Sequence, residues 1–358
     1  MRVLTAYMFC TNGGVETALK NRIKNISSDQ VEIDLLFLED YGGQSLFDGL
    51  NCNVYIESNL EAIKKIISQG CYDIVISIDT PIILDLLYKM NYRGTIGLEV
   101  HTTYANSLQY LKSLKPNLVS FIVVPSLYQK KLINEFIALD IDIYVLPNSI
   151  DTNFFKPVPT PVVGSRPIIA WVGRIDKHKN WNLYLDVAKA ITEQEQGKVE
   201  FWLIGGMKSE PTQIEAFHDK IRAYGLSNNF RWLPYVPYSC MPSAYSYIAQ
   251  SGGCYITTSS NESFGMTVIE AMACGCPVVA NSVGALIELL EDAKYGLLID
   301  MKRETITSVS DNILAFINNK ARRRKTTFEA NKYVVSSFNE LVVQKKYIEI
   351  LKGVLCEL

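Results

Sequence analysis

Short apolar runs alternate with helical segments along the whole of this 358-residue chain. Runs such as RVLTAYM (residues 2–8), DIVISID (73–79) and IIAWVG (168–173) are apolar through most of their length, without regular polar alternation. A strand has such a continuous apolar sequence when both faces of its sheet are buried, and helices bury both faces of a parallel sheet. The alternation therefore predicts an α/β fold built on parallel sheets.

The strand and helix pattern occurs twice. A segment rich in proline and glycine, FKPVPTPVVGSRP (residues 155–167), separates the two halves and reads as an interdomain connection. The length is sufficient for two domains of ordinary size. We expect one Rossmann-like domain over residues 1–153 and a second over residues 154–337.

Composition excludes several classes of protein. The net charge of −2 gives no electrostatic reason to expect nucleic acid as a partner. No apolar run reaches the length of a membrane span, and the first residues, MRVLTAYMFCTNGG, lack the features of a signal peptide. Eight cysteines without a CxxC pair and only three histidines make a zinc site or disulfide framework unexpected. We expect a cytoplasmic protein with reduced thiols.

Ligands of open parallel sheets bind at the carboxyl ends of the strands, where loops lead into helices. The loop and helix NESFGMTVIEAMACGCPVV (residues 261–279) carries two carboxylates, Glu262 and Glu270, eight residues apart. We expect a helix from Ser263, with the amides of residues 264–267 free for phosphate or sugar oxygens. If both carboxylates are helical, their spacing of roughly 12 Å suits an extended ligand such as a nucleotide sugar. The open alternative is a capped helix with a solvated Glu262 and a structural Glu270.

Cationic residues follow a strand in WVGRIDKHKN (residues 171–180). Arg174 and Lys179 could neutralise a leaving diphosphate without a metal. The alternative is a solvated basic loop, and we assign Lys177 and His178 to that class.

Two loops of the first half are further candidates. In CTNGGVE (residues 10–16), Gly14 could offer a backbone amide to phosphate, or the loop could be a simple turn. In LEVHTTY (98–104), His101 could donate to a sugar hydroxyl or could be structural.

Other polar motifs are assigned to structure. LDID (139–142) contains a DxD pattern but lies between a helix and a strand. YQKK (128–131) and LKSLK (111–115) read as solvated helix faces, with contact to an anionic membrane surface as the alternative. Cys274 and Cys276 have no basic neighbour to lower the thiol pKa, so thiol chemistry is not expected.

Taken together and in order, these loops resemble the retaining glycosyltransferases of family 4, which have the GT-B architecture. The resemblance covers nearly the whole chain. It rests on GGVE, PNSID, VGRIDKHKN, LIGG, ESFGMTVIEAMACGCPVVA and VGALIE. The pair Glu262 and Glu270 matches the family's E-x7-E signature. Two other positions differ from the family's usual pattern. Gln250 stands where the family often has an acidic residue, and Asn180 stands where glycine is common.

The resemblance implies two Rossmann-like domains that face each other across a cleft, with residues 338–358 packing back onto the first domain. It implies retaining, metal-independent transfer of a hexosyl or N-acetylhexosaminyl group from a nucleoside-diphosphate sugar, by the family's habit a UDP-sugar. The acceptor would be a hydroxyl of a sugar, a lipid-linked compound or a small molecule, in bacterial polysaccharide, glycolipid or glycosylated-metabolite biosynthesis. No cofactor is implied, and peripheral contact with the inner membrane face is allowed.

The resemblance also implies residue roles. Glu262 would contact the donor sugar, Glu270 the ribose, and His101 the reacting sugar. The diphosphate would be held by Arg174, Lys179, Gly14 and the amides of Phe264, Gly265, Met266 and Thr267. Gly205, in LIGG, would lie against the base.

Three alternatives stay open: a nucleotide-sugar epimerase of GT-B type, a phosphorylase of similar architecture, and a non-catalytic nucleotide-sugar-binding scaffold. A phosphorylase would require a pyridoxal-binding lysine and a much longer chain.

Overall fold

The computed structural model describes residues 1–26, 30–161 and 166–356. It divides into two compact units, which we describe separately. The first unit comprises Met1–Ile150 and Phe338–Leu358, and the second comprises Asp151–Ser337. The predicted boundary after residue 153 lies just inside the second unit.

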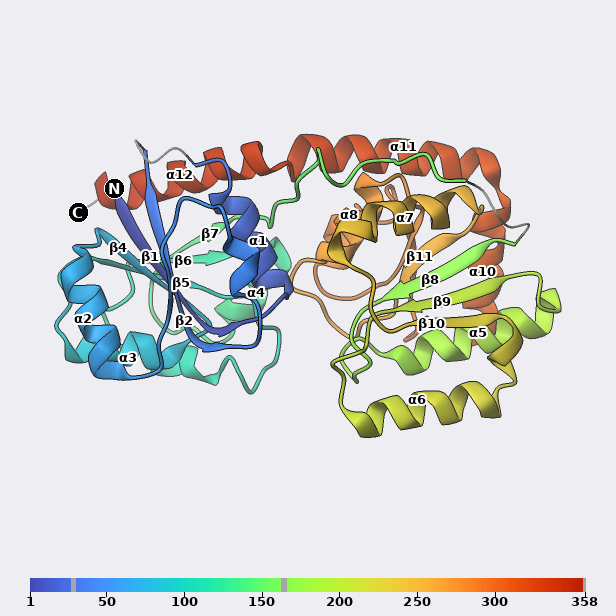
Figure 1. Ribbon diagram of the computed structural model, residues 1–358, viewed down its shortest axis with the longest axis horizontal. Coiled ribbons are helices and arrows are strands. Elements are labelled where there is room, and N and C mark those ends of the chain that lie inside the picture. The colour runs from blue at the N-terminus through green and yellow to red at the C-terminus, as the bar shows by residue number, and fades with distance from the viewer. Residues whose placement is uncertain (27–29, 162–165, 357–358) are drawn as a thin grey trace. The chain divides into compact units, whose positions relative to one another are not determined.

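The first unit contains a parallel sheet of seven strands in the order β3-β2-β1-β4-β5-β6-β7 (Figure 1). The strands are β1 (Arg2–Cys10), β2 (Glu32–Asp40), β3 (Val54–Ile56), β4 (Ile74–Ile78), β5 (Thr95–Glu99), β6 (Phe121–Val124) and β7 (Asp142–Val145). The helices are α1 (Gly14–Ile23), α2 (Leu60–Gly70), α3 (Pro81–Lys89), α4 (Leu127–Asn134) and α12 (Glu340–Cys356), with short 3-10 helices at Gln44–Phe47 and Gln109–Ser113.

Both faces of this sheet are buried. Val3 packs with Leu19 of α1 and Val343 of α12, whereas the next residue, Leu4, packs with Ile63 of α2 and Ile83 of α3. Successive side chains of a strand point to opposite faces, so every position must be apolar when helices cover both. This double burial explains the continuous apolar runs in the sequence.

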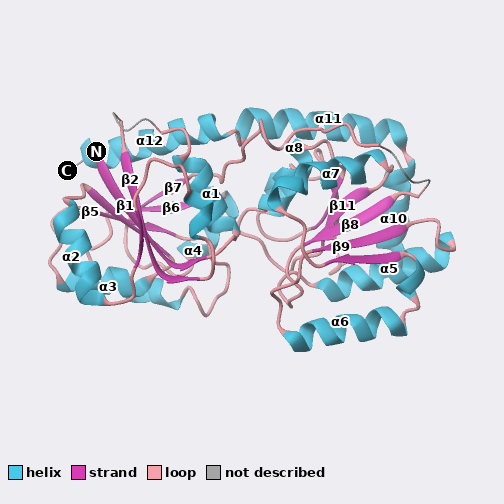
Figure 2. Ribbon diagram, in the orientation of Figure 1, coloured by secondary structure: helices cyan, strands magenta, loops and turns pink. Residues whose placement is uncertain are grey.

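The second unit contains a parallel sheet of six strands in the order β10-β9-β8-β11-β12-β13 (Figure 2). The strands are β8 (Ile168–Val172), β9 (Glu200–Ile204), β10 (Phe230–Leu233), β11 (Cys254–Thr257), β12 (Val278–Asn281) and β13 (Leu297–Ile299). The helices are α5 (Trp181–Glu195), α6 (Pro211–Ala223), α7 (Met241–Gln250), α8 (Met266–Ala273), α9 (Leu286–Leu289), α10 (Ile306–Asn318) and α11 (Lys320–Ser337), with 3-10 helices at Leu226–Asn228 and Tyr238–Cys240. The prediction of two parallel-sheet α/β units is confirmed.

The described part of the segment predicted as an interdomain connection lies within the second unit and not between the units. Residues 162–165 lie outside the described part, but residues 155–161 pack onto the second unit. Phe155 is buried, the Val158 amide donates to Ser246 Oγ at 2.9 Å, and Gln250 Nε2 donates to the Val158 carbonyl at 2.8 Å. The chain passes between the units at residues 150–151 and 337–338 instead.

Three local expectations were wrong. The helix expected around LKSLK is only the 3-10 helix Gln109–Ser113, and α3, which begins at Pro81, was not expected. YQKK is not a wholly solvated face, because Gln129 is buried and Lys130 Nζ donates to the Ile143 carbonyl at 2.8 Å.

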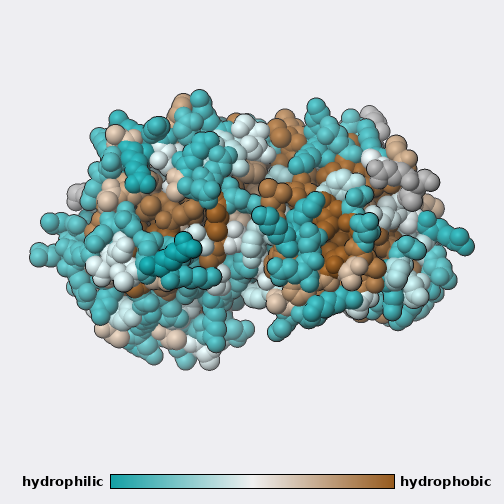
Figure 3. Space-filling model, turned by 180° about the vertical axis from the view of Figure 1, so that it is seen from behind, coloured by the Kyte–Doolittle hydropathy of each residue, from teal (hydrophilic) through white to brown (hydrophobic). Residues whose placement is uncertain are grey.

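On the face shown in Figure 3, hydrophilic side chains cover much of the rim of each unit. Among the described residues, no helix combines the length and apolar character needed to cross a bilayer.

Candidate active site

Candidate residues of the second unit lie in loops at the carboxyl ends of β8, β9 and β11 and in helix α8, which follows the loop after β11. Arg174 and Lys179 follow β8, Gly205 follows β9, and Glu262 follows β11. Because the strands are parallel neighbours, these loops emerge from the same edge of the sheet. The fold therefore brings together side chains from three separate sequence motifs.

Lys179 and Glu262 form an ion pair. Lys179 Nζ lies 2.6 Å from Glu262 Oε1, and Ser259 Oγ donates to the same oxygen at 2.7 Å. The Glu262 side chain is 15% exposed and that of Lys179 24%, so water screens the pair only partly. Because Oε1 accepts hydrogen bonds from both donors, Oε2 is the oxygen that can accept a hydrogen bond from a ligand hydroxyl.

The loop around Lys179 is tied to the loop around Glu262 by backbone contacts as well. The Ser260 amide donates to the His178 carbonyl at 2.8 Å, and Thr258 Oγ1 donates to the Asn180 carbonyl at 2.9 Å. These bonds fix the separation of the two charged side chains. His178 is half-buried in this contact, so its assignment to a solvated loop was wrong, whereas Lys177 is exposed as expected.

The charge state of Glu262 follows from these partners. Burial alone would raise the pKa of this carboxyl, but the Lys179 ammonium and the Ser259 hydroxyl lower it by more. The net pKa lies below the ordinary value, so Glu262 is a carboxylate at neutral pH. Glu262 lies in the loop before α8, so the two carboxylates are not both helical.

The start of α8 presents backbone amides. Gly265 is the N-cap residue, with φ +114°, and no side chain caps this end. The amides of Val268 and Ile269 both donate to the Gly265 carbonyl. The preceding amides, of Met266 and Thr267, have no carbonyl within the helix, which is the arrangement that binds anions at helix N-termini. The helix begins at Met266, three residues after the expected start at Ser263.

Glu270 lies one turn into α8 and is buried, with 7% of its surface exposed. Tyr245 Oη of α7 donates to Glu270 Oε2 at 3.2 Å. Burial raises the pKa of Glu270 to about 8, and the Tyr245 hydrogen bond offsets this only in part. A neutral carboxyl can both donate to and accept from a hydroxyl, which suits a diol such as that of ribose.

Arg174 and Gly205 lie beside this cluster. Arg174 is largely exposed, with Nη2 3.1 Å from Asp176 Oδ2, so its guanidinium is held only weakly in one position. Gly205 has φ +107°, and a Cβ at this position would lie 2.5 Å from the Gly173 carbonyl oxygen. Only glycine allows the loops after β8 and β9 to approach this closely.

In the first unit, Gly14 is the first residue of α1 and is exposed. Glu16, from the first turn, reaches back so that Oε1 accepts from Thr11 N at 2.7 Å and from Thr11 Oγ1 at 2.5 Å. A phosphate bound at the Gly14 amide would therefore have a carboxylate nearby. The predicted role of Gly14 stays a prediction.

His101 follows β5 and is fixed at its backbone and its ring. The amides of His101 and Thr102 donate to Asp79 Oδ2 at 2.8 and 2.9 Å. The ring nitrogen Nε2 lies 2.7 Å from Glu99 Oε1. Burial raises the pKa of Asp79, although the His101 contacts oppose the rise.

Sequence reasoning missed four supporting side chains: Ser259, Tyr245, Glu99 and Asp79. Ser259 and Glu99 lie within three residues of predicted site residues, so local spacing could have suggested them. Tyr245 is far from Glu270 in sequence, and Asp79 is far from His101, so only the tertiary structure could reveal these two.

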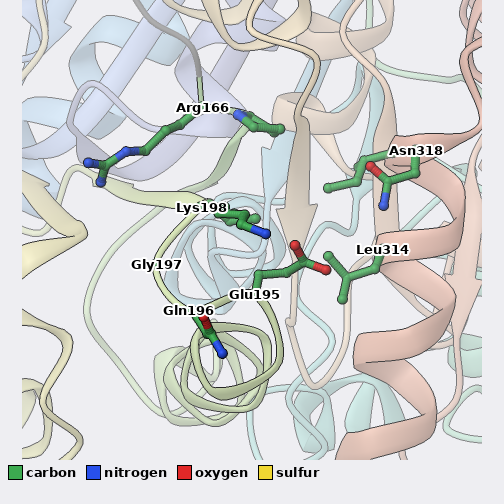
Figure 4. Close-up of a pocket in the computed structure, with 10 residues that line it drawn as sticks. Arg166, Glu195, Gln196, Gly197, Lys198, Leu314 and Asn318 are labelled. Carbon is green, nitrogen blue, oxygen red and sulfur yellow. The ribbon is translucent and has the colours of Figure 1, made fainter.

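A pocket of about 540 Å³ lies elsewhere on the second unit (Figure 4). Its lining includes Arg166 before β8, Lys198 before β9 and Glu195 at the end of α5. These positions are at the amino ends of the strands, at the opposite edge of the sheet from Lys179 and Glu262. The pocket is therefore separate from the candidate site.

The described side chains offer neither a metal site nor a reactive thiol at Cys274 or Cys276. In residues 1–26, 30–161 and 166–356, no group of three or more histidine, cysteine, aspartate or glutamate side chains is arranged to hold a metal ion. Burial raises the pKa of the Cys274 thiol to about 12 and that of Cys276 well above its ordinary value, which agrees with a packing role for both.

Comparison with known proteins identifies the family. The family model for glycosyl transferases group 1 matches residues 154–333, which include every candidate residue of the second unit. The chain belongs to the group 1 glycosyl transferases. The match identifies group 1 only, so membership of family 4 and the E-x7-E signature stay predictions.

Curated relatives of this family match over part of their length. A 2-deoxystreptamine N-acetyl-D-glucosaminyltransferase of Niallia circulans is 25% identical over 205 residues, covering 57% of this chain and 50% of the relative. A sucrose synthase of Beta vulgaris is 36% identical over 146 residues, covering 38% of this chain and 19% of the relative. The chain thus spans half or less of the length of these relatives.

Solved structures share the fold over almost the whole of this chain. HepE of Anabaena, crystallised with UDP and glucose, gives a TM-score of 0.85 at 18% identity, covering 99% of this chain and 100% of that one. Sucrose-phosphate synthase of Thermosynechococcus elongatus gives 0.81 at 16% identity, covering 100% of both. The fold is GT-B, as the sequence resemblance implied.

Proposed function

We propose that this group 1 glycosyl transferase is a retaining, metal-independent enzyme that transfers a sugar from a UDP-sugar to an acceptor hydroxyl. The observation that carries the proposal is the cluster of Lys179, Glu262 and Ser259 beside the open amides at the start of α8. The cluster lies within the segment that the family model matches.

The donor would bind through complementary charge. Arg174, Lys179 and the amides of Met266 and Thr267 supply positive charge for a diphosphate. Oε2 of Glu262 accepts a hydrogen bond from a hydroxyl of the transferred sugar. The buried carboxyl of Glu270 forms hydrogen bonds with the ribose diol. The loop after β9, at Gly205, and the end of β10, at Leu233, provide backbone against which a base can pack.

The reaction exchanges one bond for another at the anomeric carbon. The bond from this carbon to the diphosphate oxygen breaks, and a bond to the acceptor oxygen forms on the same face. The acceptor's proton passes to the leaving diphosphate. Cations and amides stabilise the negative charge that develops on that diphosphate, so no metal is required for this role.

One solved structure and one relative support a UDP-sugar as the donor. The Anabaena HepE crystals contained UDP and glucose, and the Niallia relative is named an N-acetyl-D-glucosaminyltransferase. A hexosyl or N-acetylhexosaminyl group is therefore the proposed transferred group. Sugars, lipid-linked compounds and small molecules with a free hydroxyl are the proposed acceptor classes.

The test is hydrolysis of a panel of UDP-, GDP- and ADP-sugars in EDTA, followed by mass spectrometry. Release of UDP from one donor without added metal supports the proposal. Strict dependence on a divalent metal would contradict it. Nucleotide binding without release of UDP, with or without candidate acceptors, would favour a non-catalytic binding protein, and a changed sugar on intact donor would favour an epimerase.

Matched variants connect activity to the cluster. Lys179→Met should reduce turnover at least about a hundredfold, because a developing charge loses its stabilising cation. Lys177→Met removes an exposed lysine from the same loop and should leave turnover unchanged. Equal rates for the two variants would remove Lys179 from the site.

A further inference from the structure

Four side chains of the first unit form a buried chain that ends at His101. The ring of Tyr347, on α12, lies 4.7 Å from the guanidinium carbon of Arg22, on α1. Arg22 pairs with Glu99, at the end of β5, through two hydrogen bonds of 2.8 Å. Glu99 Oε1 then meets His101 Nε2 at 2.7 Å. Arg22, Glu99 and Tyr347 are each 2% exposed or less.

Stability alone does not account for this arrangement. A buried ion pair loses as much through desolvation as it gains by attraction, and well-packed apolar residues of similar volume are often at least as stable. The pair here is bidentate, and the face of an aromatic ring covers the cation. Such a pair holds one carboxylate oxygen at a defined point, which is what orienting a neighbouring ring requires.

The geometry also assigns the two ring nitrogens of His101. Glu99 is held as a carboxylate by Arg22, so Oε1 can only accept, and Nε2 of His101 must donate. The imidazole side chain is 8% exposed, and Asp79 fixes the backbone on which it stands. Nδ1 is therefore the nitrogen that remains for a ligand. In the neutral ring it accepts a hydrogen bond.

We propose that Glu99 is the positioning residue for His101, that Arg22 and Tyr347 hold Glu99, and that this arrangement leaves Nδ1 as the ring nitrogen available to a ligand. This rests on the proposed function and on the family resemblance, which implies that His101 contacts the reacting sugar. It also gives α12 a role beyond packing, because the last helix of the chain supplies the ring that covers Arg22.

Imidazole NMR tests the hydrogen bond without any activity. The chain has three histidines, so 15N-histidine labelling gives three ring systems, which His178→Gln and His218→Gln assign. We expect one Nε2 proton, that of His101, to be shifted downfield and protected from solvent exchange. Absence of such a resonance in the wild-type protein would overturn the proposal, whatever the enzyme's activity.

Kinetics test the consequence. Arg22→Met combined with Glu99→Leu replaces the ion pair by apolar residues of similar volume. We expect the protected proton to be lost and kcat to fall about tenfold, with the donor KM little changed, because the donor's diphosphate binds the second unit. Retention of kcat after loss of the resonance would overturn the positioning role and leave the proposed function intact.

A double-mutant comparison separates positioning from general damage. In a His101→Ala background, the Arg22→Met/Glu99→Leu change should have no further effect on kcat, because the ring that it orients is absent. A further fall of the same size would show that the pair acts independently of His101.

Tyr347 provides a milder test if the paired substitution does not fold. Tyr347→Phe keeps the ring over Arg22 but removes the hydroxyl that also interacts with Arg22, so it should lose less of kcat and of the proton's protection than Tyr347→Leu. If these two variants have the same kcat and the same exchange rate, α12 has no role in holding His101.

Discussion

Glu262 and Glu270 are eight residues apart in the sequence, yet their surroundings shift their pKa values in opposite directions. Both are largely buried, but only Glu262 has a cationic partner, Lys179. Glu270 has a neutral one, the Tyr245 hydroxyl. At neutral pH the first is therefore an anion and the second is mostly a protonated acid, so they offer different hydrogen-bonding to a ligand.

Removing either carboxyl should affect a different kinetic constant. Glu262→Ala should mainly lower kcat, because its carboxylate would contact the transferred sugar while the bond breaks. Glu270→Ala should mainly raise the donor dissociation constant, because the ribose is not altered by the reaction. Steady-state kinetics and calorimetry with the donor measure both constants. If both variants keep wild-type values, the site assignment is wrong.

Glu270 should also make stability depend on pH. Its pKa is raised from 4.5 to about 8, so between these values the folded chain holds a proton that the unfolded chain has lost. The stability contributed by this proton is complete below pH 4.5 and is lost as pH rises to about 8. Glu270→Gln stays neutral, so its Tm relative to wild type should increase over this range and then level off.

The control for this measurement is Glu193→Gln, at a side chain that is 68% exposed on α5. Its Tm should follow that of the wild type at every pH. A Tm difference for Glu270→Gln that is constant between pH 4.5 and 8 would show that Glu270 titrates normally in the folded protein.

At the scale of elements, the start of α8 depends on one glycine. A Cβ on Gly265 would lie 2.9 Å from Leu286 Cδ2 of α9, and its φ of +114° is unfavourable for any other residue. Gly265→Ala should destabilise the second unit by about 1–3 kcal/mol and weaken donor binding, because the amides of Met266 and Thr267 would move.

Gly197→Ala is the matched control. Its φ is +78°, but nothing lies within 4 Å of the added Cβ, so this variant has the backbone cost without the collision. Thermal unfolding and donor titration compare the two. If Gly197→Ala weakens donor binding as much as Gly265→Ala does, the effect does not come from the α8 amides.

Some elements were readable from the sequence and others were not. β1 has a long apolar pattern, and its extent, Arg2–Cys10, matches the expected run at residues 2–8 closely. Asn180, noted as a departure from the family's glycine, has φ +53°, a conformation that asparagine tolerates better than most residues. The start of α8 was placed too early because no local rule shows that Asn261 and Ser263 stay in the loop while Gly265 caps the helix.

At the scale of the whole chain, the C-terminal residues belong to the first unit. Val343, Tyr347 and Leu351 of α12 are buried in the same core as Val3 and Leu19. All four tryptophans lie in the second unit, at positions 171, 181, 202 and 232. Tryptophan fluorescence therefore reports on the second unit, while far-UV circular dichroism reports on both.

Deletion of residues 338–358 should unfold the first unit selectively, because it removes one wall of that core. The fluorescence transition should keep its midpoint to within a few degrees, and the dichroism signal should lose the contribution of the first unit. A fluorescence midpoint that falls with the dichroism signal would mean that the second unit needs the first to fold.

The sequence by itself determined the fold class, the two-unit plan and the loops that carry the candidate residues. These depend on local patterns: strands buried on both faces must be apolar throughout, and glycine and polar residues collect where strands lead into helices. Tertiary structure decided the partners. Lys179 is 83 residues from Glu262, and Arg22 is 77 residues from Glu99. Charge, pKa and orientation depend on what a side chain contacts, and the chain brings such residues together only when it folds.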